Sequence, residues 1–544
     1  MWVTERSGAA GPTLPATPPN EAGRTPHNAQ TTQTAPPSQA ATGQVATGLA
    51  GASSHAGPRH PGHPAVYRMP LAVWFDGPME VGRMLAACGE VVRRHPVLTS
   101  TLAERDGVLR LLTGTAEVPI TLAEAPADPL DLAGAGHLDL ATGPLARFTL
   151  ARTGPDRHLL VFAAHHIVFD GMSKDILVRD LATAYAGEPL PPLPLPYGEA
   201  VEDENARVRD RLAGAAEFWR TRWHDSRELV LPGLGTPTLH AAPGDAVDFV
   251  LGDEVGRAAA SLGLTRFEVV LSALRLLLHA YGNARAAVAV DLSTRTEATR
   301  EHVGLFVNEL PFEVVPSGTF AEFAADVRAE LRRMYAYRHV PLARALGGVS
   351  PRAALTPVSL SYRARSEAEP VFPGLAASVE WMMFNGAVRN TLHLQVVDGP
   401  RGTAARLQYN PRHLDRAGCE SVAADLTALL RGVADRPHAP IDDLPLPSRV
   451  AGAGGGTGLQ RPRAGGTDAG LVVAVGEIWR QVLDLDHVDP ADDLFDLGGH
   501  SLSITQIIAR VRDTMAVDLP FEVFIDDPTV EGVAAEVARQ RSLT

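Results

Sequence analysis

The chain has 544 residues and a formal net charge of −14, and 45% of its residues are hydrophobic. At roughly 150 residues per domain, this length predicts about three structural units. Much of the acidity lies in residues 469–544, which hold 14 acidic and 5 basic side chains. Such a charge is repelled by nucleic-acid phosphates, so we expect partners with basic protein surfaces and no nucleic acid.

The two cysteines, Cys88 and Cys419, stand far apart and outside any metal-ligand spacing. This spacing argues against a disulfide framework and against a zinc site, so we expect no metal. No apolar run is as long as the about 20 residues that a helix needs to cross a bilayer. The N-terminus also lacks the apolar stretch of a signal peptide. We therefore expect a cytoplasmic protein without a membrane partner.

Residues 1–62 are rich in Ala, Thr, Pro, Gly and Ser and show no sustained periodicity. A segment of this kind buries too little apolar surface to offset its ordering entropy. We predict a disordered tail, with a docking tail for another protein as the alternative.

A first lobe is predicted over residues 63–240, with order beginning near Tyr67. Its periodicities predict a helix over 81–94 and strands over 70–75, 108–112 and 146–152. Residues 146–164 are predicted to form a hairpin that turns at Gly154-Pro155-Asp156. The second strand of this hairpin ends in two histidines, and Ser173 is the predicted N-cap of the following helix.

A second lobe is predicted over residues 241–445. Its expected elements are helices over 265–281 and 320–337 and strands over 286–292, 358–362, 391–397 and 405–409. This order favours a sheet with helices on one side. Before this lobe, the prolines of 189–196 exclude a continued helix, and a helix is predicted over 212–223. The simplest fold class that accounts for these elements is two α/β lobes with mixed sheets.

Residues 446–468 are Gly-rich and predict a flexible linker. Residues 469–544 then show three helical patterns, the second beginning at Ser501 and the last with Pro528 near its first turn. These patterns predict a small all-α domain.

Residues 496–502, Asp-Leu-Gly-Gly-His-Ser-Leu, place Ser501 at a predicted helix N-terminus. Taken alone, this serine could simply cap the helix. The whole run, with the acidic approach Asp-Asp-Leu-Phe at 492–495, resembles the peptidyl carrier domain of nonribosomal peptide synthetases, a four-helix domain. The resemblance implies that Ser501 carries a covalent 4'-phosphopantetheine arm, whose phosphate gains from helix N-terminal N–H groups.

Residues 165–171, His-His-Ile-Val-Phe-Asp-Gly, lie at the predicted strand-to-helix turn. Adjacent side chains on an extended segment point to opposite faces, so one histidine can face a cavity while the other is packed. A satisfied core histidine is the alternative. The pattern HHxxxDG resembles the signature of condensation domains of nonribosomal peptide synthetases and of chloramphenicol acetyltransferase. Three further passages are similar to the condensation family: Trp219 after a Pro-Tyr-Gly-Glu segment, residues 304–311, and residues 339–342.

This resemblance implies a condensation domain over 63–445, built as two chloramphenicol acetyltransferase-like lobes. It implies His166 as the catalytic residue and His165 as a packed scaffold residue. Asp170 is expected to be structural and to pair with an arginine of the second lobe, for which Arg295 is the candidate.

Two further residues are expected to support the site. Gly171 would allow close backbone approach to the substrate, and Asn308 lies in the passage 304–311 that resembles the family.

The expected chemistry suits a histidine. Amide formation from a thioester needs an amine with a free lone pair, whereas α-amino groups have pKa values of about 7.7 to 8.0. A histidine with a pKa of about 6.5 can accept or share that proton as a general base, or hold the amine by hydrogen bonding. Both roles remain open.

The chain departs from the family pattern in two places. The family usually opens with a helix that carries a Gln and an Arg-Leu-Trp run, and nothing before Pro70 matches it. No adenylation domain is recognisable, so we expect loading by a trans-acting adenylation enzyme. The other expected partners are an upstream carrier protein, a phosphopantetheinyl transferase and a downstream assembly-line domain.

The expected function is that of a condensation and carrier didomain, which joins a carrier-bound acyl or peptidyl thioester to an amine on the arm at Ser501. One alternative is an acyltransferase that passes a group from Ser501 to a free amine or alcohol. Another is a non-catalytic docking platform for enzymes that modify a carrier-bound substrate. A platform predicts a damaged histidine motif, and the motif of this chain is whole.

Overall fold

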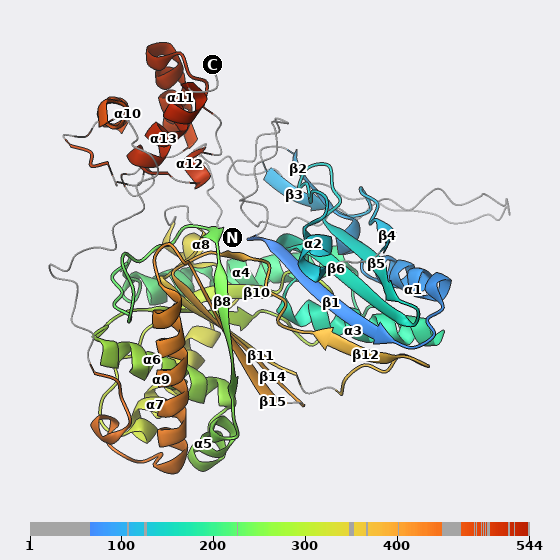
Figure 1. Cartoon of the computed structure of the whole chain (residues 1–544). Coiled ribbons are helices and arrows are strands. Elements are labelled where there is room, and N and C mark those ends of the chain that lie inside the picture. The colour runs from blue at the N-terminus through green and yellow to red at the C-terminus, as the bar shows by residue number, and fades with distance from the viewer. Residues whose placement is uncertain are drawn as a thin grey trace, which may run out of the picture.

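The computed structural model describes residues 66–448 and 469–541, except for short gaps. The gaps are 106–107, 125–127, 226, 348–352, 366–367, 401, 484, 486, 491, 493, 495–496, 498–500, 520–522 and 527. The predicted tail and most of the predicted linker lie outside the described residues. Figure 1 shows the arrangement of the elements.

The first lobe is built on a five-stranded mixed sheet with the order β12-β1-β6-β5-β4. Its strands are β1 (Arg68–Asp76), β4 (Ile120–Glu124), β5 (Ala146–Gly154), β6 (Arg157–His165) and β12 (Ala376–Glu380). A separate hairpin pairs β2 (Thr101–Arg105) with β3 (Val108–Leu112). Helices α1 (Val81–Arg94) and α3 (Gly171–Ala186) bury one face of the sheet, and the short α2 (Pro129–Gly134) lies on the other.

Local pattern predicted this lobe well. Helix α1 has the predicted bounds and buries Met84, Cys88 and Val91 on one face. The predicted hairpin is confirmed, because β5 pairs with β6 in antiparallel register from Ala146 opposite Ala164. Alternating apolar residues on both strands reach the core, so the hairpin delivers its last residues to a defined edge of the sheet.

The second lobe contains a six-stranded sheet with the order β10-β9-β11-β14-β15-β8. Its strands are β8 (Asp245–Leu251), β9 (Val288–Ser293), β10 (Val307–Phe312), β11 (Val358–Ala364), β14 (Leu392–Gly399) and β15 (Gly402–Tyr409). The helices that form its main core are α5 (Glu254–Leu262), α6 (Arg266–Tyr281), α7 (Phe320–Tyr335) and α9 (Arg416–Asp435). The mixed sheets and the two-lobed α/β architecture are as predicted.

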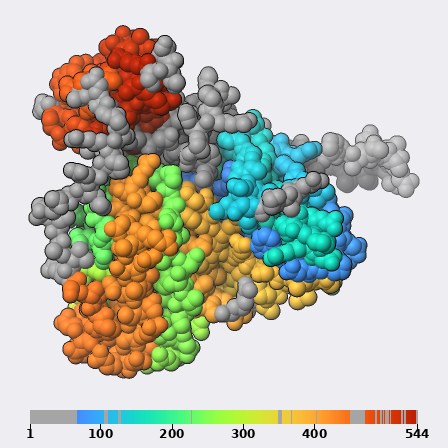
Figure 2. All heavy atoms as spheres, in the orientation of Figure 1, coloured from blue at the N-terminus to red at the C-terminus, as the bar shows by residue number. Residues whose placement is uncertain are grey.

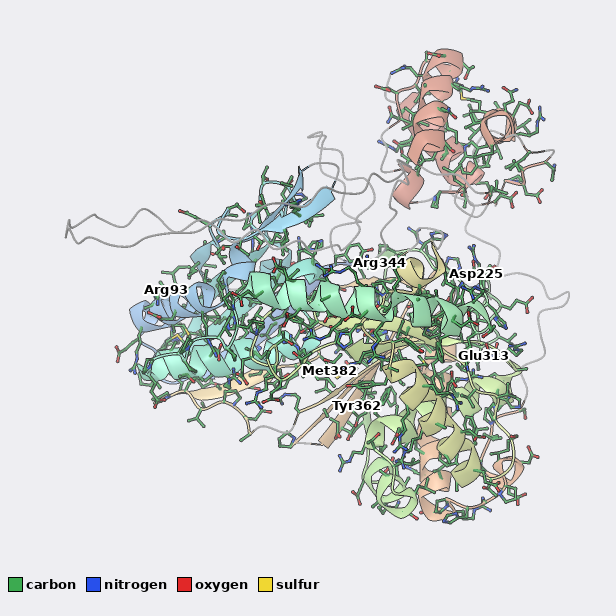
Figure 3. The ribbon with its side chains drawn as sticks, turned by 180° about the vertical axis from the view of Figure 1, so that it is seen from behind. Arg93, Asp225, Glu313, Arg344, Tyr362 and Met382 are labelled. Atoms are coloured by element: carbon green, nitrogen blue, oxygen red, sulfur yellow. The ribbon has the colours of Figure 1, made fainter. Side chains whose placement is uncertain are left out.

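Helix α4 (Tyr197–Arg220) joins the lobes and is longer than the predicted 212–223. It begins directly after Pro196, where proline favours a helix start, and its charged first half lacks the apolar periodicity that would have predicted it. Tyr197 packs against the first core, whereas Trp219 is buried in the second. Seen from behind, α4 crosses from one lobe to the other (Figure 3).

Strand β12 is a second connection between the lobes. It follows β11 of the second lobe in sequence, but it pairs antiparallel with β1 at the edge of the first sheet, with Ala72 opposite Glu380. In the space-filling view, gold atoms of this part of the chain continue beneath the blue and cyan first lobe (Figure 2). The predicted lobe boundaries did not anticipate this crossing, because pairing between distant segments leaves no local pattern.

The C-terminal domain comprises α10 (Ala469–Leu483), α11 (Ser501–Met515), α12 (Val523–Asp526) and α13 (Val530–Arg541). Its core includes Trp479, Ile507 and Val533. The predicted all-α domain is confirmed.

In the described part of the chain, no helix combines the length and apolarity that a bilayer crossing needs. Across the same residues, no group of three or more His, Cys, Asp or Glu is placed to hold a metal ion. The short strands β7 (Ala242–Pro243) and β13 (Ala387–Val388) pair with each other, and the short helix α8 (Leu342–Leu346) packs into the core of the second lobe.

Candidate active site

The two histidines lie where β6 gives way to α3. Strand β6 ends at His165, a short 3-10 turn covers His166–Val168, and α3 begins at Gly171. The backbone N–H of His166 donates to the carbonyl of Tyr67 at 2.7 Å. This bond fixes the backbone of the turn to the start of the neighbouring strand β1.

The two histidine side chains have different surroundings. His165 Nδ1 accepts a hydrogen bond from the Ile167 N–H at 3.1 Å, and its ring lies 5.8 Å from that of Tyr67. Burial, with the charges of His166 and Arg68, lowers the pKa of His165 to about 4. This side chain is committed to local structure.

The side chain of His166 is not held in this way. Its Nδ1 is buried and has no hydrogen-bond partner within the described ranges. Burial and then the positive charge of Arg389 lower the pKa of His166 below its ordinary value. The imidazole is therefore neutral near pH 7 and retains a free lone pair, which a proton acceptor requires.

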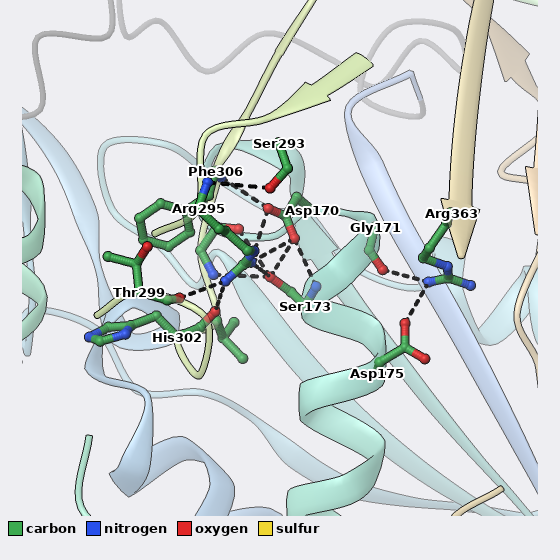
Figure 4. Close-up of polar contacts among 12 residues, drawn as sticks. Asp170, Gly171, Ser173, Asp175, Ser293, Arg295, Thr299, His302, Phe306 and Arg363 are labelled. Atoms are coloured by element: carbon green, nitrogen blue, oxygen red, sulfur yellow. Dashed lines mark hydrogen bonds and ion pairs between the residues drawn. The ribbon is translucent and has the colours of Figure 1, made fainter. Parts of the chain in front are cut away.

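Asp170 joins the turn to the second lobe (Figure 4). Arg295 Nη2 donates to both of its carboxylate oxygens, at 2.9 and 3.0 Å, and the Phe306 N–H donates to Oδ2 at 3.0 Å. Burial raises the pKa of Asp170, but Arg295 and the N–H donors outweigh it, so the pKa lies below the ordinary value. The expected ion pair between Asp170 and Arg295 is present.

The predicted N-cap at Ser173 is wrong. Asp170 is the N-cap of α3, and its Oδ1 accepts from the Ser173 N–H at 2.8 Å. Ser173 is instead a buried residue of the first turn, and its Oγ accepts from the Gly304 N–H at 3.1 Å and from Arg295 Nη2 at 3.1 Å. A carboxylate caps as well as a hydroxyl, and only the tertiary structure shows that it has a second role.

Arg295 also organises its own lobe. It donates to the carbonyls of Thr299 at 3.0 Å and His302 at 2.5 Å, and its guanidinium lies 4.7 Å from the centre of the Phe306 ring. Through these contacts and its bond to Asp170, Arg295 holds the residues between β9 and β10 against the start of α3.

Gly171 and Asn308 make structural contacts. The Gly171 carbonyl accepts from Arg363 at 2.5 Å, and a Cβ at this glycine would lie 4.0 Å from the Arg363 side chain, which is ordinary contact. The expected close approach of substrate to Gly171 stays a prediction. Asn308 donates to the carbonyls of Arg338 and Val340 at 2.9 and 3.1 Å, so it holds the segment that contains the passage 339–342.

Sequence analysis missed a charged group close to His166. Asp291 on β9 and Glu309 on β10 are register partners, and Arg389 pairs with Glu309 at 3.3 Å. Burial and the charge of Glu309 raise the pKa of Asp291 to about 7. The available signal was a single carboxylate inside the apolar run Val-Ala-Val-Asp-Leu at 288–292. Arg389, in an irregular segment, carried no such signal.

More polar side chains lie on the same sheet. The ring nitrogens of His393 on β14 lie 2.8 Å from Ser359 Oγ and 3.0 Å from Ser361 Oγ on β11. Helices bury the opposite face of these strands, so side-chain alternation directs the polar residues away from the core.

In the C-terminal domain, α11 begins at Ser501. A helix N-terminus presents free N–H groups and the positive end of the helix dipole, which suits a phosphate ester on its first residue. The neighbouring residues 498–500 lie outside the described residues, and the side chain of Ser501 is likewise not described.

The structure thus combines two α/β lobes joined by a crossing strand, a whole HHxxxDG turn locked between them and a separate helical domain. The family model "Condensation domain" matches residues 60–451, and "Phosphopantetheine attachment site" matches residues 473–537. The chain belongs to the condensation-domain family, and its C-terminal domain is a phosphopantetheine attachment domain. Such a domain implies a phosphopantetheinyl transferase and further assembly-line components as partners.

Similar curated proteins are nonribosomal peptide synthetases. Tyrocidine synthase 3 of Brevibacillus parabrevis is 26% identical over 402 residues, which cover 70% of this chain and 6% of that protein. Surfactin synthase subunit 1 of Bacillus subtilis is 25% identical over 406 residues, which cover 71% of this chain and 11% of that protein. The matches thus span a small fraction of these relatives.

Solved structures share the fold. The first condensation domain of the CDA synthetase has a TM-score of 0.56 at 21% identity and covers 70% of this chain and 94% of that one. The X-domain from teicoplanin biosynthesis has a TM-score of 0.58 at 24% identity and covers 70% and 93%. At these identities the likeness shows the fold alone.

Proposed function

We propose that this chain forms an amide bond between an acyl or peptidyl group carried by an upstream carrier and an amine carried at Ser501. The observation that carries the proposal is the whole histidine turn: Asp170 is locked by Arg295, while the neutral side chain of His166 has no hydrogen-bond partner among the described residues. A turn built only for structure would have its polar atoms satisfied.

The chemistry needs little else from the protein. When bound, the phosphopantetheine arm supplies a thiol on which an amino acid is presented. The amine nitrogen forms a bond to the carbonyl carbon of the donor thioester, the carbon–sulfur bond breaks, and a proton passes from nitrogen to the departing sulfur. His166 accepts or shares that proton, or holds the amine in line. Because the donor is already activated, neither ATP nor an acyl-enzyme is required.

The rest of the site orients these groups. His165 is a scaffold residue, Asp170 and Arg295 hold the turn between the lobes, and Gly171 and Asn308 support the two segments that meet it. Burial and then the positive charge of Arg389 keep His166 neutral, and Arg389 is itself held by Glu309. An upstream carrier, a trans-acting adenylation enzyme and a downstream domain complete the proposed assembly.

Intact-mass measurement tests the proposal. The carrier is converted to its phosphopantetheine form, loaded with a panel of aminoacyl groups and mixed with an acylated upstream carrier. We expect the added mass to remain on Ser501, and Ser501→Ala to prevent loading. Release of product into solution would instead support transfer from Ser501 to a free amine or alcohol.

The role of His166 has its own test. Because a positioned acid or base contributes about 10²- to 10⁴-fold, His166→Ala should slow condensation by that range with loading unchanged. His165→Ala serves as the neighbouring control and should act mainly on stability. Undiminished condensation in His166→Ala, with intact loading, would contradict the role of His166 as a base or positioning residue. Intact loading without any condensation by the unaltered protein would support a docking platform. The solved complex of the teicoplanin X-domain with OxyB concerns that protein, and at 23% identity it carries only the fold.

A further inference from the structure

Asp291 is a carboxylate without a partner on the face of the second sheet that the core helices leave free. Its neighbours on β9, Val290 and Leu292, point into the main core, so side-chain alternation turns Asp291 to the opposite, polar face. Within the described ranges, the Asp291 side chain makes no hydrogen bond or ion pair. A carboxylate that is withdrawn from water and left unpaired is costly, so its presence here needs an explanation.

The carboxylate opposite Asp291 is already paired. Glu309 is the register partner of Asp291 on β10, and it binds Arg389 at 3.3 Å. Two carboxylates thus share one arginine, which leaves one negative charge in excess when both are ionised. In line with this excess, burial and then the charge of Glu309 raise the pKa of Asp291 to about 7, against a weaker opposing effect of Arg389.

Arg389 connects this excess charge to the histidine turn. After the effect of burial, the charge of Arg389 is the next cause of the lowered pKa of His166, and the same charge acts on Asp291. Tyr67, whose carbonyl accepts from the His166 N–H at 2.7 Å, also lies within reach of the charges of Arg389 and Glu309. The polar face of the sheet and the histidine turn therefore border the same space.

This space is accessible to solvent. The side chains of Arg389 and Glu309 are 24% and 12% exposed, and Asp291 and His166 are likewise only half-buried. By contrast, Val290 on the core face of β9 is 0% exposed. A ligand group therefore has access to Asp291 on the face of the sheet that borders the histidine turn.

We propose that Asp291 binds the ammonium group of the amine substrate. One ammonium supplies the single positive charge that the two carboxylates and Arg389 lack, and its three N–H donors suit a carboxylate that has no partner among the described residues. A divalent cation fits less well, because in the described part of the chain no group of three or more His, Cys, Asp or Glu is placed to hold a metal ion.

The inference rests on the proposed function for the presence of an amine, and it names the charged form in which that amine is recognised. The ammonium belongs either to the α-amino group that enters the amide or to a basic side chain of the same aminoacyl group. Asp291 is a binding residue in this scheme, and His166 keeps the role proposed above.

Calorimetric titration of the full chain tests the proposal with amide-linked pantetheine analogues, which cannot transfer their acyl group. The alanyl analogue is compared with the N-acetylalanyl analogue, and the Nα-acetyllysyl analogue with the Nα-acetylnorleucyl analogue. In one of these pairs we expect the cationic member to bind about tenfold more tightly than the neutral one, which is the strength of a charge-assisted hydrogen bond. The responding pair shows whether the ammonium is the α-amino group or a side chain.

Proton release provides a signature of the carboxylate itself. A pKa of about 7 leaves Asp291 partly protonated at neutral pH, so the binding of an ammonium should release part of a proton. The heats in two buffers of different ionisation enthalpy measure this release. Asp291→Asn should abolish both the preference for the cation and the proton release, whereas Asp291→Glu should retain part of the preference.

Asp435→Asn is the matched control, because it removes an exposed carboxylate of the same lobe, and it should change neither quantity. Equal binding of the cationic and neutral members of both pairs to the unaltered protein would overturn the proposal. A preference that survives in Asp291→Asn, with the fold intact by circular dichroism, would do the same. The titration involves no bond formation, so its result does not depend on whether the proposed condensation takes place.

Discussion

Asp170 and Lys174 lie one turn apart at the start of α3, and both are almost completely buried, at 2% and 3% exposure. Asp170 has every kind of partner a carboxylate can use: an arginine, a hydroxyl and two backbone N–H groups. Lys174 has none among the described residues, and two arginines face it. One helix turn therefore holds a fully compensated charge and an uncompensated one.

The difference between Asp170 and Lys174 shows that a buried charge can have opposite effects on stability. A compensated charge fixes geometry, because removing either partner leaves the other buried and unpaired. An uncompensated charge lowers stability, because burial removes its hydration and no partner replaces it. The two residues should consequently respond to mutation in opposite directions.

The largest effect is expected at the compensated charge. Arg295→Met leaves Asp170 buried without its cation and should destabilise the protein by about 3 to 5 kcal/mol. Because the pKa of Asp170 is depressed in the folded state, this stability is present above its unfolded pKa of about 3.9 and is lost as the pH falls further. Urea unfolding of the full chain measures it.

A double-mutant cycle sharpens this result. Asp170→Asn combined with Arg295→Met removes both charges, so the pair should cost less than the sum of the single changes. Arg93→Met, which removes an exposed partner of Glu90, is the control and should change stability by at most about 0.5 kcal/mol. Simple additivity would mean that the ion pair does not couple the lobes.

At Lys174 we expect a substitution to increase the stability of the protein instead of lowering it. Lys174→Met should stabilise the protein by about 2 to 5 kcal/mol near pH 7. The folded pKa of about 7 lies below the ordinary lysine value of 10.5, so the penalty grows as the pH falls from 10.5 to 7 and is constant below that. Thermal unfolding at pH 6, 8 and 10 should show a gain that shrinks with rising pH, and a loss of stability would refute the comparison.

A smaller effect should separate the two roles left open for His166. Burial and the positive charge of Arg389 depress the pKa of His166, and Arg389→Gln removes that charge, so this pKa should rise. If His166 is a general base, the acidic limb of the condensation pH profile moves to higher pH by the same amount. If His166 only positions the amine, the limb stays and the rate alone changes. Arg93→Gln is the control.

The smallest effect is expected at Ser173. Ser173→Ala removes a buried hydroxyl that joins Asp170, Arg295 and Gly304, and should cost about 1 to 3 kcal/mol, because the Gly304 N–H loses its partner. Urea unfolding checks it, with the exposed Ser421→Ala as the matched serine control. A neutral result would place the strength of the network in the ion pair alone.

The elements with strong periodicity were predictable from sequence. The bounds of α1, the β5–β6 hairpin with its turn and the start of α11 at Ser501 follow from apolar spacing and turn residues, which are local properties. The first half of α4 was missed because its charged residues show no apolar stripe. The capping of α3 was assigned to Ser173 because sequence cannot show which of two polar residues faces the helix N–H groups.

The candidate site divides in the same way. The histidines, Asp170 and Ser501 stand in contiguous motifs and could be named from the sequence, and the motif order also suggested Arg295. Arg389, Glu309 and Asp291 could not be grouped, because they come from three separate segments that only the folded second lobe brings together.

By itself, the sequence determined that this chain has two α/β lobes, an all-α carrier domain, a histidine turn and a serine at a helix start, because each is encoded within a few tens of residues. The tertiary structure decided that β12 crosses to the first sheet, that Asp170 is satisfied by the second lobe and that Lys174 is left without a partner. Burial and pairing depend on residues far apart in the chain, and these long-range contacts distinguish the charge that stabilises the fold from the charge that destabilises it.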